Sequence, residues 1–209
     1  LFHSVSAFCN AGFDLLGTKW HPFVSLTSYA VNPVINIVIM LLIIIGGIGF
    51  FTWEDIYLHK FHFKHYHMQS KVILTTTLCL ILLPAVFFFF QDYGNLSGIH
   101  RLLASLFQAV TPRTAGFNTT DLSMLTGASK AMMILLMLIG GSPSSTAGGM
   151  KTTTFALLLL NVLATFQSCD DVTAFGRRID ASVIKNATTI AMMYFILFFA
   201  GGMTISVYE

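Results

Sequence analysis

The sequence predicts an all-α membrane protein that crosses the bilayer several times and contains an internal repeat. Three observations lead to this fold class. Hydrophobic residues make up 55% of the 209 residues and charged residues only 10%, whereas globular domains carry roughly 25% charged residues. Long apolar runs alternate with short polar segments. The tripeptide Ala-Gly-Phe occurs at 11–13 and at 115–117, each time followed by a short polar residue.

Four apolar runs are candidates for membrane spans, which need about 20 mostly apolar residues each. They cover approximately residues 31–51, 72–90, 130–166 and 188–207. No charged segment precedes an apolar stretch at the start, so we expect no signal peptide. Because the apolar pattern reaches both ends, we expect the chain to be an internal fragment of a larger protein.

The third run is too long for one span. About 37 helical residues would reach about 55 Å, whereas the hydrocarbon core is roughly 30 Å thick. Its middle, GGSPSSTAGGMKTTT at 140–154, is unsuited to a regular helix. We therefore expect two apolar pieces joined by a non-helical loop at membrane depth. Such backbone is tolerated only where it is buried in protein or lines a water-filled cavity.

Two basic linkers, at 52–71 and 167–187, predict the orientation of the chain. The positive-inside rule places both linkers in the cytoplasm and both Ala-Gly-Phe motifs on the outer side. The linkers' basic residues are Lys60, Lys64, Lys71, Arg177, Arg178 and Lys185. The net charge of +2 is too small to indicate nucleic-acid binding.

The first linker also holds His59, His62, His65 and His67, which leave two interpretations open. Histidine clusters can bind zinc. These histidines alternate with lysines and aromatic residues, so the favoured interpretation is a basic face toward lipid headgroups or a partner. The three cysteines are widely separated and match no zinc or redox spacing.

A short amphipathic segment leads into each Ala-Gly-Phe motif. FHSVSAF (2–8) precedes the first and IHRLLASLFQAV (99–110) precedes the second. Both segments are too short to span a bilayer. We expect each to be a re-entrant helix that enters the membrane and returns through the polar turn that follows. Internal repetition of this kind is typical of channels and transporters.

The motif glycines suit a cation filter. A cation that crosses a membrane exchanges its water shell for other oxygens, and re-entrant loops supply backbone carbonyls for this purpose. Exposing carbonyls in a tight loop favours glycine, which adopts backbone angles that other residues resist. Gly12 and Gly116 meet this demand.

Neighbouring side chains are expected to support the turns. Phe13 and Phe117 would wedge each loop against its surroundings. Asn10, Thr114 and Asn118 would hold the turns from behind by hydrogen bonds. The alternative interpretation is that Ala-Gly-Phe plus a polar residue is an ordinary loop between helices, which two copies on one inferred side make less favourable.

Arg113 is unusual so close to a candidate pore, because charges within membranes are costly and are usually paired or functional. One interpretation is that it braces the loop by bonding carbonyls or an acid such as Asp121. The other is that it faces outside water.

The loop at 140–154 allows three interpretations. A phosphate-binding loop is excluded because Met150 separates Gly149 from Lys151 and no strand precedes it. A serine hydrolase lacks the G-x-S-x-G motif and an obvious histidine base. The favoured interpretation is a flexible plug below the filter, in which Lys151 repels or competes with a passing cation. A static helix break is the simpler alternative.

These motifs together resemble a known family. AFCNAGFD, QAVTPRTAGFNT and especially LIGGSPSSTAGGMKTTTF are similar to the Trk/Ktr/HKT superfamily of potassium transporters, most of all to bacterial Ktr membrane subunits. The resemblance covers essentially the whole chain. It implies M1–P-loop–M2 units, like those of potassium channels, around one central pore, and no enzyme activity.

The resemblance also assigns segments of the chain to these units. They are residues 1–52 (P-loop and M2 of the second unit), 53–71 (cytosolic linker), 72–166 (third unit, with its gating loop at 140–154), 167–187 (cytosolic linker) and 188–209 (M1 of the fourth unit). The family's first and fourth filter loops are absent from the sequence. The choice between potassium and sodium therefore stays open, and a sodium-transporting member of the superfamily is the alternative.

The resemblance implies site residues by position. The filter residues are Asn10, Ala11, Gly12, Phe13, Thr114, Ala115, Gly116, Phe117 and Asn118, with Arg113 as their support. The gating loop comprises Gly140, Gly141, Ser142, Pro143, Ser144, Ser145, Thr146, Ala147, Gly148, Gly149 and Lys151. The only metal expected is potassium, as transported ion, at the filter carbonyls.

The implied surroundings are a cell membrane, a second copy of the full-length subunit in a homodimer, and a cytosolic ring that binds a regulatory nucleotide. No cofactor is expected in this chain. Two rivals from other classes are an intramembrane hydrolase using a serine of 142–145 and a membrane scaffold that transports nothing.

Overall fold

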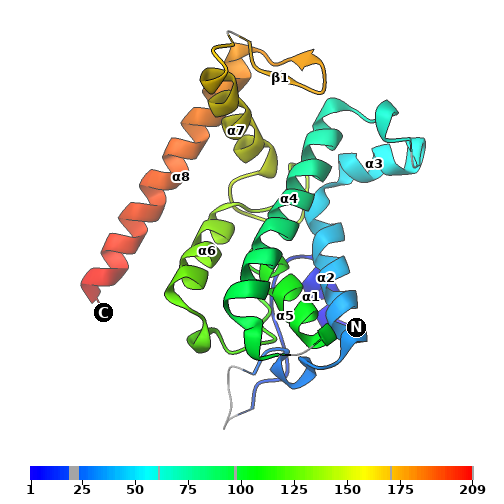
Figure 1. Ribbon diagram of the computed structural model, residues 1–209, viewed down its shortest axis with the longest axis vertical. Coiled ribbons are helices and arrows are strands. Elements are labelled where there is room, and N and C mark those ends of the chain that lie inside the picture. The colour runs from blue at the N-terminus through cyan, green and yellow to red at the C-terminus, as the bar shows by residue number, and fades with distance from the viewer. Residues whose placement is uncertain (19–23, 61, 97, 170, 209) are drawn as a thin grey trace.

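The computed structural model describes residues 1–18, 24–60, 62–96, 98–169 and 171–208. These residues form a mostly helical molecule in which α2, α4 and α8 run roughly along the long axis (Figure 1). The helices are α1 (Phe2–Phe8), α2 (Pro33–Ile48), α3 (Phe50–His59), α4 (Met68–Gln91), α5 (Gly98–Val110), α6 (Gly127–Leu138), α7 (Thr152–Phe166) and α8 (Ala181–Tyr208). The short elements are the 3-10 turns η1 (Thr27–Tyr29), η2 (Phe63–His65), η3 (Tyr93–Asn95) and η4 (Leu122–Met124) and the antiparallel strands β1 (Thr173–Ala174) and β2 (Arg177–Arg178).

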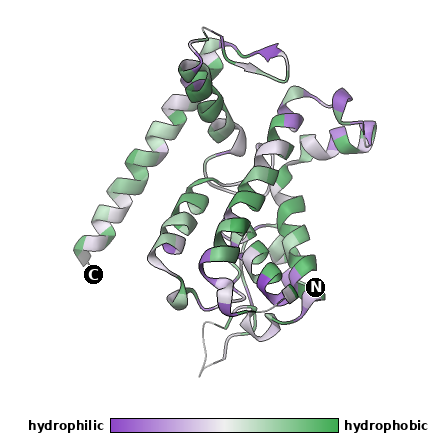
Figure 2. Cartoon of the chain, in the orientation of Figure 1, coloured by the Kyte–Doolittle hydropathy of each residue, from purple (hydrophilic) through white to green (hydrophobic). Residues whose placement is uncertain are grey.

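Two of the described helices, α4 and α8, are long and apolar enough to cross a membrane, and the bent pair α2–α3 would make a third span. α4 contains the predicted span at 72–90, and α8 contains that at 188–207. Both helices carry exposed large apolar side chains, and Figure 2 colours most of their length as hydrophobic. α8 shows this most clearly, because only 6% of its most apolar window is buried. Such a surface requires apolar surroundings, which a bilayer supplies.

The predicted span at 31–51 is helical over 33–48 and then bends sharply. α2 begins where the Asn32 side chain accepts hydrogen bonds from the amides of Val34 and Ile35, a regular N-cap. It ends at Ile48, and the chain turns by 98° into α3. Gly49 forms the bend with a φ of +96°, which a residue with a side chain resists.

The third apolar run is broken, as predicted. α6 and α7 are separated by a non-helical segment at 139–151. The prediction placed the end of this segment at Thr154, but α7 already begins at Thr152. The Thr152 hydroxyl is fully buried against the Ser142 hydroxyl, 2.9 Å away. This pairing fixes the first residue of α7 to the start of the loop.

The segment between α4 and α6 folds back on itself, and its re-entry into a membrane stays a prediction. α5 packs against α4, and the chain then returns to the end of the molecule where it left α4. Asp92, just after α4, accepts hydrogen bonds from the Thr126 amide (3.0 Å) and from the Ser129 hydroxyl. The Arg101 guanidinium donates to the Phe89 carbonyl oxygen from Nη2 (2.7 Å) and Nε (2.9 Å). The Asp92 bonds tie the start of this segment to its end, and the Arg101 bonds tie α5 to the end of α4.

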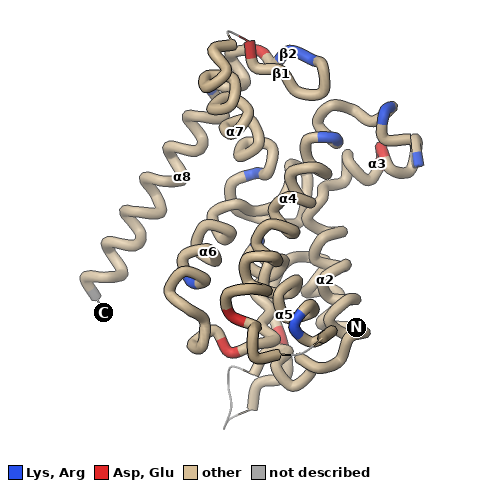
Figure 3. The backbone as a smooth tube through the Cα atoms, viewed as in Figure 1, with Lys and Arg blue, Asp and Glu red and all other residues tan. Residues whose placement is uncertain are grey.

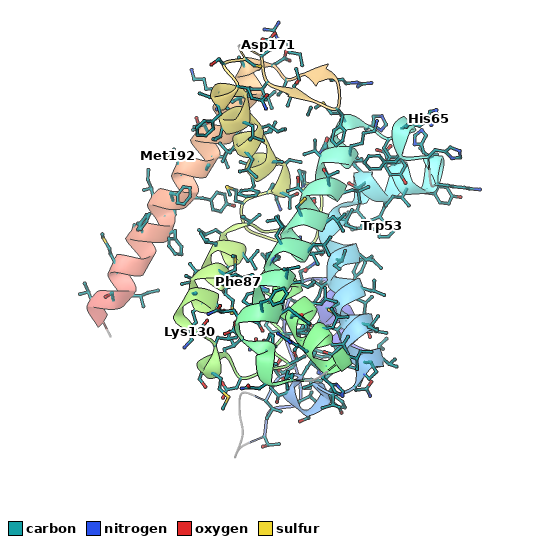
Figure 4. All side chains as sticks on the ribbon, viewed as in Figure 1. Trp53, His65, Phe87, Lys130, Asp171 and Met192 are labelled. Atoms are coloured by element: carbon teal, nitrogen blue, oxygen red, sulfur yellow. The ribbon has the colours of Figure 1, made fainter. Side chains whose placement is uncertain are left out.

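Both basic linkers lie at one end of the molecule. Figure 3 shows several Lys and Arg residues at the end that carries α3 and the β1–β2 pair, and others on α5 and α6. In Figure 4, His65 of the first linker and Asp171 of the second lie at this end, far from Lys130. The predicted orientation requires both linkers to lie on the same side of the membrane. The compartment that this side faces stays a prediction.

The linkers contain more regular structure than predicted. The segment at 167–187 holds the β1–β2 pair, and its last residues, 181–187, are already part of α8. α8 packs against α7, and Ile184 contacts the apolar cluster that includes Ala156 and Ala164 of α7. Glu209, the end of the predicted fourth-unit helix, lies outside the described residues.

A buried carboxylate joins the first linker to α4. Asp55 on α3 accepts hydrogen bonds from the backbone amide of His67 (3.1 Å) and pairs with its ring Nδ1 (2.6 Å). Burial alone raises the pKa of Asp55, but hydrogen bonds from Ser70 and His67 outweigh it and hold the pKa below its ordinary value. This contact fixes α3 across the start of α4.

Candidate ion filter and intramembrane loop

The first Ala-Gly-Phe motif turns sharply after α1. Asn10 and Gly12 have φ angles of +51° and +72°. The Ala11 amide donates to the Ser6 carbonyl oxygen (2.9 Å), and the Ser6 hydroxyl donates to the Phe13 carbonyl oxygen (2.9 Å). The end of α1 therefore holds both sides of the turn.

The second motif repeats this conformation after α5. Thr114 and Gly116 have φ angles of +70° and +84°. The amides of Ala115 and Gly116 both donate to the Thr111 carbonyl oxygen at 3.1 Å, and the Thr111 hydroxyl donates to the Phe117 carbonyl oxygen. In each motif the left-handed residues are thus the glycine and the residue two before it. The sequence repeat is also a repeat in backbone structure.

The two motifs lie against each other, although 104 positions separate their glycines. A Cβ atom built on Gly12 would stand 2.2 Å from the Ala115 carbonyl oxygen and 3.2 Å from the Gly116 Cα. No side chain fits at that distance. Gly12 is therefore required both by its φ angle and by the approach of the second motif.

Three consecutive carbonyls in each motif accept no hydrogen bond from any described residue. They belong to residues 10–12 and 114–116, whereas the carbonyls of Phe13 and Phe117 are bonded to hydroxyls. Ala11 and Gly116 are exposed and Gly12 and Thr114 are half-buried, so most of these carbonyls belong to residues at the surface of this chain rather than in its core. Two side-chain oxygens at matching positions, Asn10 Oδ1 and Thr114 Oγ1, are buried without a partner among the described residues.

The predicted supporting side chains behave differently from one another. Phe117 is fully buried and packs with Phe107 of α5 in the main core, as a wedge would. Phe13 is 69% exposed, so the wedge expected there is not formed by this chain. Asn10 donates hydrogen bonds behind its turn, whereas the Asn118 side chain makes none to the described residues. Asn118 contributes through its backbone, which bonds to Ser25 and Leu26.

Arg113 is buried and has no ion pair with any described residue. It is only 7% exposed, so it does not face open water, and its Nε atom lacks a hydrogen-bond partner. The suggested partner Asp121 instead accepts a hydrogen bond from the Ser123 amide (2.9 Å). The expected brace through Asp121 is therefore wrong. Arg113 lies next to the second motif, and its role as filter support stays a prediction.

The loop at 140–151 docks onto the break between α2 and α3. The amide of Ser142 donates to the Gly47 carbonyl oxygen (2.9 Å) and the amide of Thr146 to that of Gly46 (3.2 Å). In the other direction, the Phe50 amide donates to the Ser144 carbonyl oxygen (3.0 Å). The broken helix of the third predicted unit thus fills the bend in the second.

Bonds within the loop hold it in a compact shape. The Gly140 amide donates to the Met150 carbonyl oxygen (2.9 Å), and the Gly141 amide donates to the Gly148 carbonyl oxygen (3.3 Å). A Cβ atom on Gly140 would stand 1.7 Å from the Gly148 carbonyl oxygen. Lys151 Nζ donates to the Ala147 carbonyl oxygen (2.8 Å), so its charge caps the loop's own backbone.

The loop serines do not form a hydrolase site among the described residues. Ser142 pairs with Thr152, and the Ser145 hydroxyl donates to the Ser142 carbonyl oxygen (2.6 Å). No described histidine bonds to either serine. A metal centre is not apparent either, since no group of three or more His, Cys, Asp or Glu side chains among the described residues is placed to hold an ion.

The part that α2 plays in this site was not predicted from the sequence. A Cβ atom on Gly46 would stand 1.9 Å from the Phe8 carbonyl oxygen, and one on Gly49 2.4 Å from that of Pro143. The signal was present as the GGIG sequence at 46–49. Glycines inside an apolar helix indicate a close approach of other backbone.

Comparisons with known proteins agree with this architecture. The family model TrkH, described as a cation transport protein, matches residues 1–208. The Ktr system potassium uptake protein B of Bacillus subtilis (strain 168) is 37% identical over 215 residues, which cover 100% of this chain and 47% of that protein. The potassium/sodium uptake protein NtpJ of Enterococcus hirae is 37% identical over 214 residues, covering 100% of this chain and 46% of that protein. The chain thus spans about half the length of the curated relatives it matches.

The potassium transporter TrkH from Vibrio parahaemolyticus has a similar structure. The TM-score is 0.76 at 20% identity, and the match covers 95% of this chain and 43% of that one. At this identity the likeness shows a shared fold. The matched relatives are transporters rather than enzymes, so the expected family, the helical membrane fold and the membrane location are confirmed. This chain belongs to the TrkH family of cation transport proteins.

Proposed function

We propose that this chain forms half of the pore of a potassium uptake transporter and supplies two of the loops that select the cation. The observation that carries the proposal is the contact between two Ala-Gly-Phe turns whose carbonyls at 10–12 and 114–116 lack partners. Backbone carbonyls replace the hydration shell of a potassium ion in known filters. Gly12 and Gly116 allow the backbone to present them.

The loop at 140–151 is the proposed gate. It packs on the bend of α2–α3 and reaches the first Ala-Gly-Phe motif, so its position is coupled to the pore lining. It is held by hydrogen bonds rather than by a helical backbone, and several glycines let it rearrange. Lys151 places a positive charge on this loop, which would oppose a cation while the loop is closed.

The proposed partners follow from the family and from the surface. The basic end formed by α3 and the β1–β2 pair would face a cytosolic regulatory ring that binds the nucleotide, and the full-length subunit would form a homodimer. Sodium transport is the second candidate function, favoured by the similarity to a potassium/sodium uptake protein.

Potassium-dependent growth tests the proposal. The full-length gene and its regulatory partner would be expressed in a bacterium that lacks its own potassium uptake systems. We expect growth at low potassium and the loss of this growth in Gly116→Asp. The aspartate backbone would have to hold a φ of +84°, and its carboxylate would add a charge beside the proposed filter carbonyls. No growth, with the protein shown to be in the membrane, would contradict potassium uptake. Flux measurements in liposomes would then separate a sodium transporter from a scaffold that transports nothing.

A further inference from the structure

One side chain links the intramembrane loop directly to the first Ala-Gly-Phe motif. The Thr146 hydroxyl lies 3.0 Å from Asn10 Nδ2, 2.8 Å from the Phe8 carbonyl oxygen and 3.1 Å from the Gly46 carbonyl oxygen. Phe8 ends α1 and Asn10 begins the turn. The hydroxyl thus joins the loop, the turn and the α2 bend at a single point.

The chemistry of this junction is directional. A threonine hydroxyl has one proton to donate and two lone pairs to accept with. Asn10 Nδ2 can only donate, so Thr146 accepts from it and donates to the carbonyl of Phe8 or Gly46. Valine has almost the same shape as threonine but has no hydroxyl, so it can neither accept a hydrogen bond from Asn10 nor donate one to a carbonyl.

The junction is closely packed and leaves Asn10 few other partners. The remaining acceptors near Asn10 Nδ2 are the carbonyls of Ile43 (3.4 Å) and Phe8 (3.5 Å), both longer than the bond to Thr146. A Cβ atom on Gly46 would stand 2.9 Å from the Thr146 hydroxyl and 3.0 Å from Asn10 Nδ2. Asn10 also holds a φ of +51°, a conformation that needs support from its surroundings.

We infer that Thr146 is a positioning residue that sets the shape of the first Ala-Gly-Phe turn, so that the cation preference of the pore depends on the position of the intramembrane loop. The inference rests on the proposed transport function. The loop would then influence the cation preference of the pore in addition to obstructing the ion path. When the loop moves away, Asn10 loses its shortest side-chain bond, and the carbonyl that it carries is released from its fixed position.

The test compares Thr146→Val with Thr165→Val in the full-length transporter with its regulatory partner, by uptake of rubidium and sodium. Thr165 is the matched control, because it lies on α7 outside the loop and its hydroxyl donates to the Asn161 carbonyl oxygen of the same helix. We expect Thr146→Val to lower the rubidium-to-sodium preference by about fivefold, the effect of one lost hydrogen bond. Thr165→Val should leave this preference unchanged, and Thr146→Ser should retain it.

A double-mutant cycle keeps the inference testable even if Thr146→Val also lowers the amount of folded protein, because a preference is a ratio measured on the molecules that transport. Asn10→Ala and Thr146→Val should each lower the preference, and the double variant should lower it no further than either alone. Additive losses, or an unchanged preference in Thr146→Val, would overturn the inference while leaving the transport function in place. Absence of uptake by the unmodified protein would overturn the proposed function and the inference together.

Discussion

Alanine substitution at Gly12 and Gly116 distinguishes the free-energy cost of a strained backbone from that of a steric clash. Both glycines would incur the first cost, and only Gly12 the second. Both glycines have a positive φ, which costs an alanine roughly 1–2 kcal/mol. Only Gly12 faces a second obstacle, since its added Cβ would stand 2.2 Å from the Ala115 carbonyl oxygen. Ordinary contact begins near 3.4 Å, so the two loops would have to separate by more than 1 Å. Gly116 has nothing closer than 3.8 Å to its added Cβ.

Overpacking of this kind costs typically 1–3 kcal/mol. The total is therefore about 2–5 kcal/mol for Gly12→Ala and about 1–2 kcal/mol for Gly116→Ala. We expect rubidium uptake to fall at least about fivefold further in Gly12→Ala than in Gly116→Ala. Thermal unfolding of the purified full-length proteins should show the same order. Equal losses in the two variants, or a greater loss in Gly116→Ala, would refute the contact between the loops.

Three further predictions concern the rest of the site. Gly46→Ala should lower the thermal unfolding midpoint and uptake together, because its Cβ would meet the Phe8 carbonyl at 1.9 Å; Gly47→Ala, whose Cβ meets nothing within 4 Å, is the control and should change neither. Removing part of the loop at 140–151 should raise cation leak into liposomes, and an unchanged leak would indicate a purely structural break. Asp55→Asn should lower the free energy of unfolding by about 1–3 kcal/mol at neutral pH, since it removes a charged hydrogen-bond acceptor. The folded-state pKa of Asp55 is depressed, so its contribution is present above its ordinary value of 3.8 and is lost as the pH falls through the lower folded value. A difference between Asp55→Asn and the unmodified protein that persisted in stronger acid would contradict the role of this carboxylate.

The sequence was sufficient to predict α4 and α8 and the location of the loops. Apolar length predicted α4 and α8, and the excessive length of the third run predicted the break between α6 and α7. The pairing of Ala-Gly-Phe with a preceding amphipathic segment predicted both turns. These features depend on local composition, which a single sequence displays.

Features that depend on the approach of distant segments were not predicted. The bend at Gly49 is held by the Phe50 amide bonding to Ser144, almost a hundred residues away. Phe13 is exposed and Phe117 is buried, although both belong to the same tripeptide. Only Phe117 is part of the hydrophobic core cluster. Arg113 is buried, whereas its suggested partner Asp121 accepts a hydrogen bond from the Ser123 amide. Local sequence patterns do not predict such tertiary contacts.

Crystals of the full-length protein soaked in rubidium would show whether the two Ala-Gly-Phe turns bind the cation. Rubidium substitutes for potassium and is located by its anomalous scattering. We expect a peak bounded by the carbonyl oxygens of residues 10–12 and 114–116. Rubidium bound elsewhere along the pore, with these carbonyls facing protein groups instead, would contradict the assignment of the two Ala-Gly-Phe turns as a cation filter.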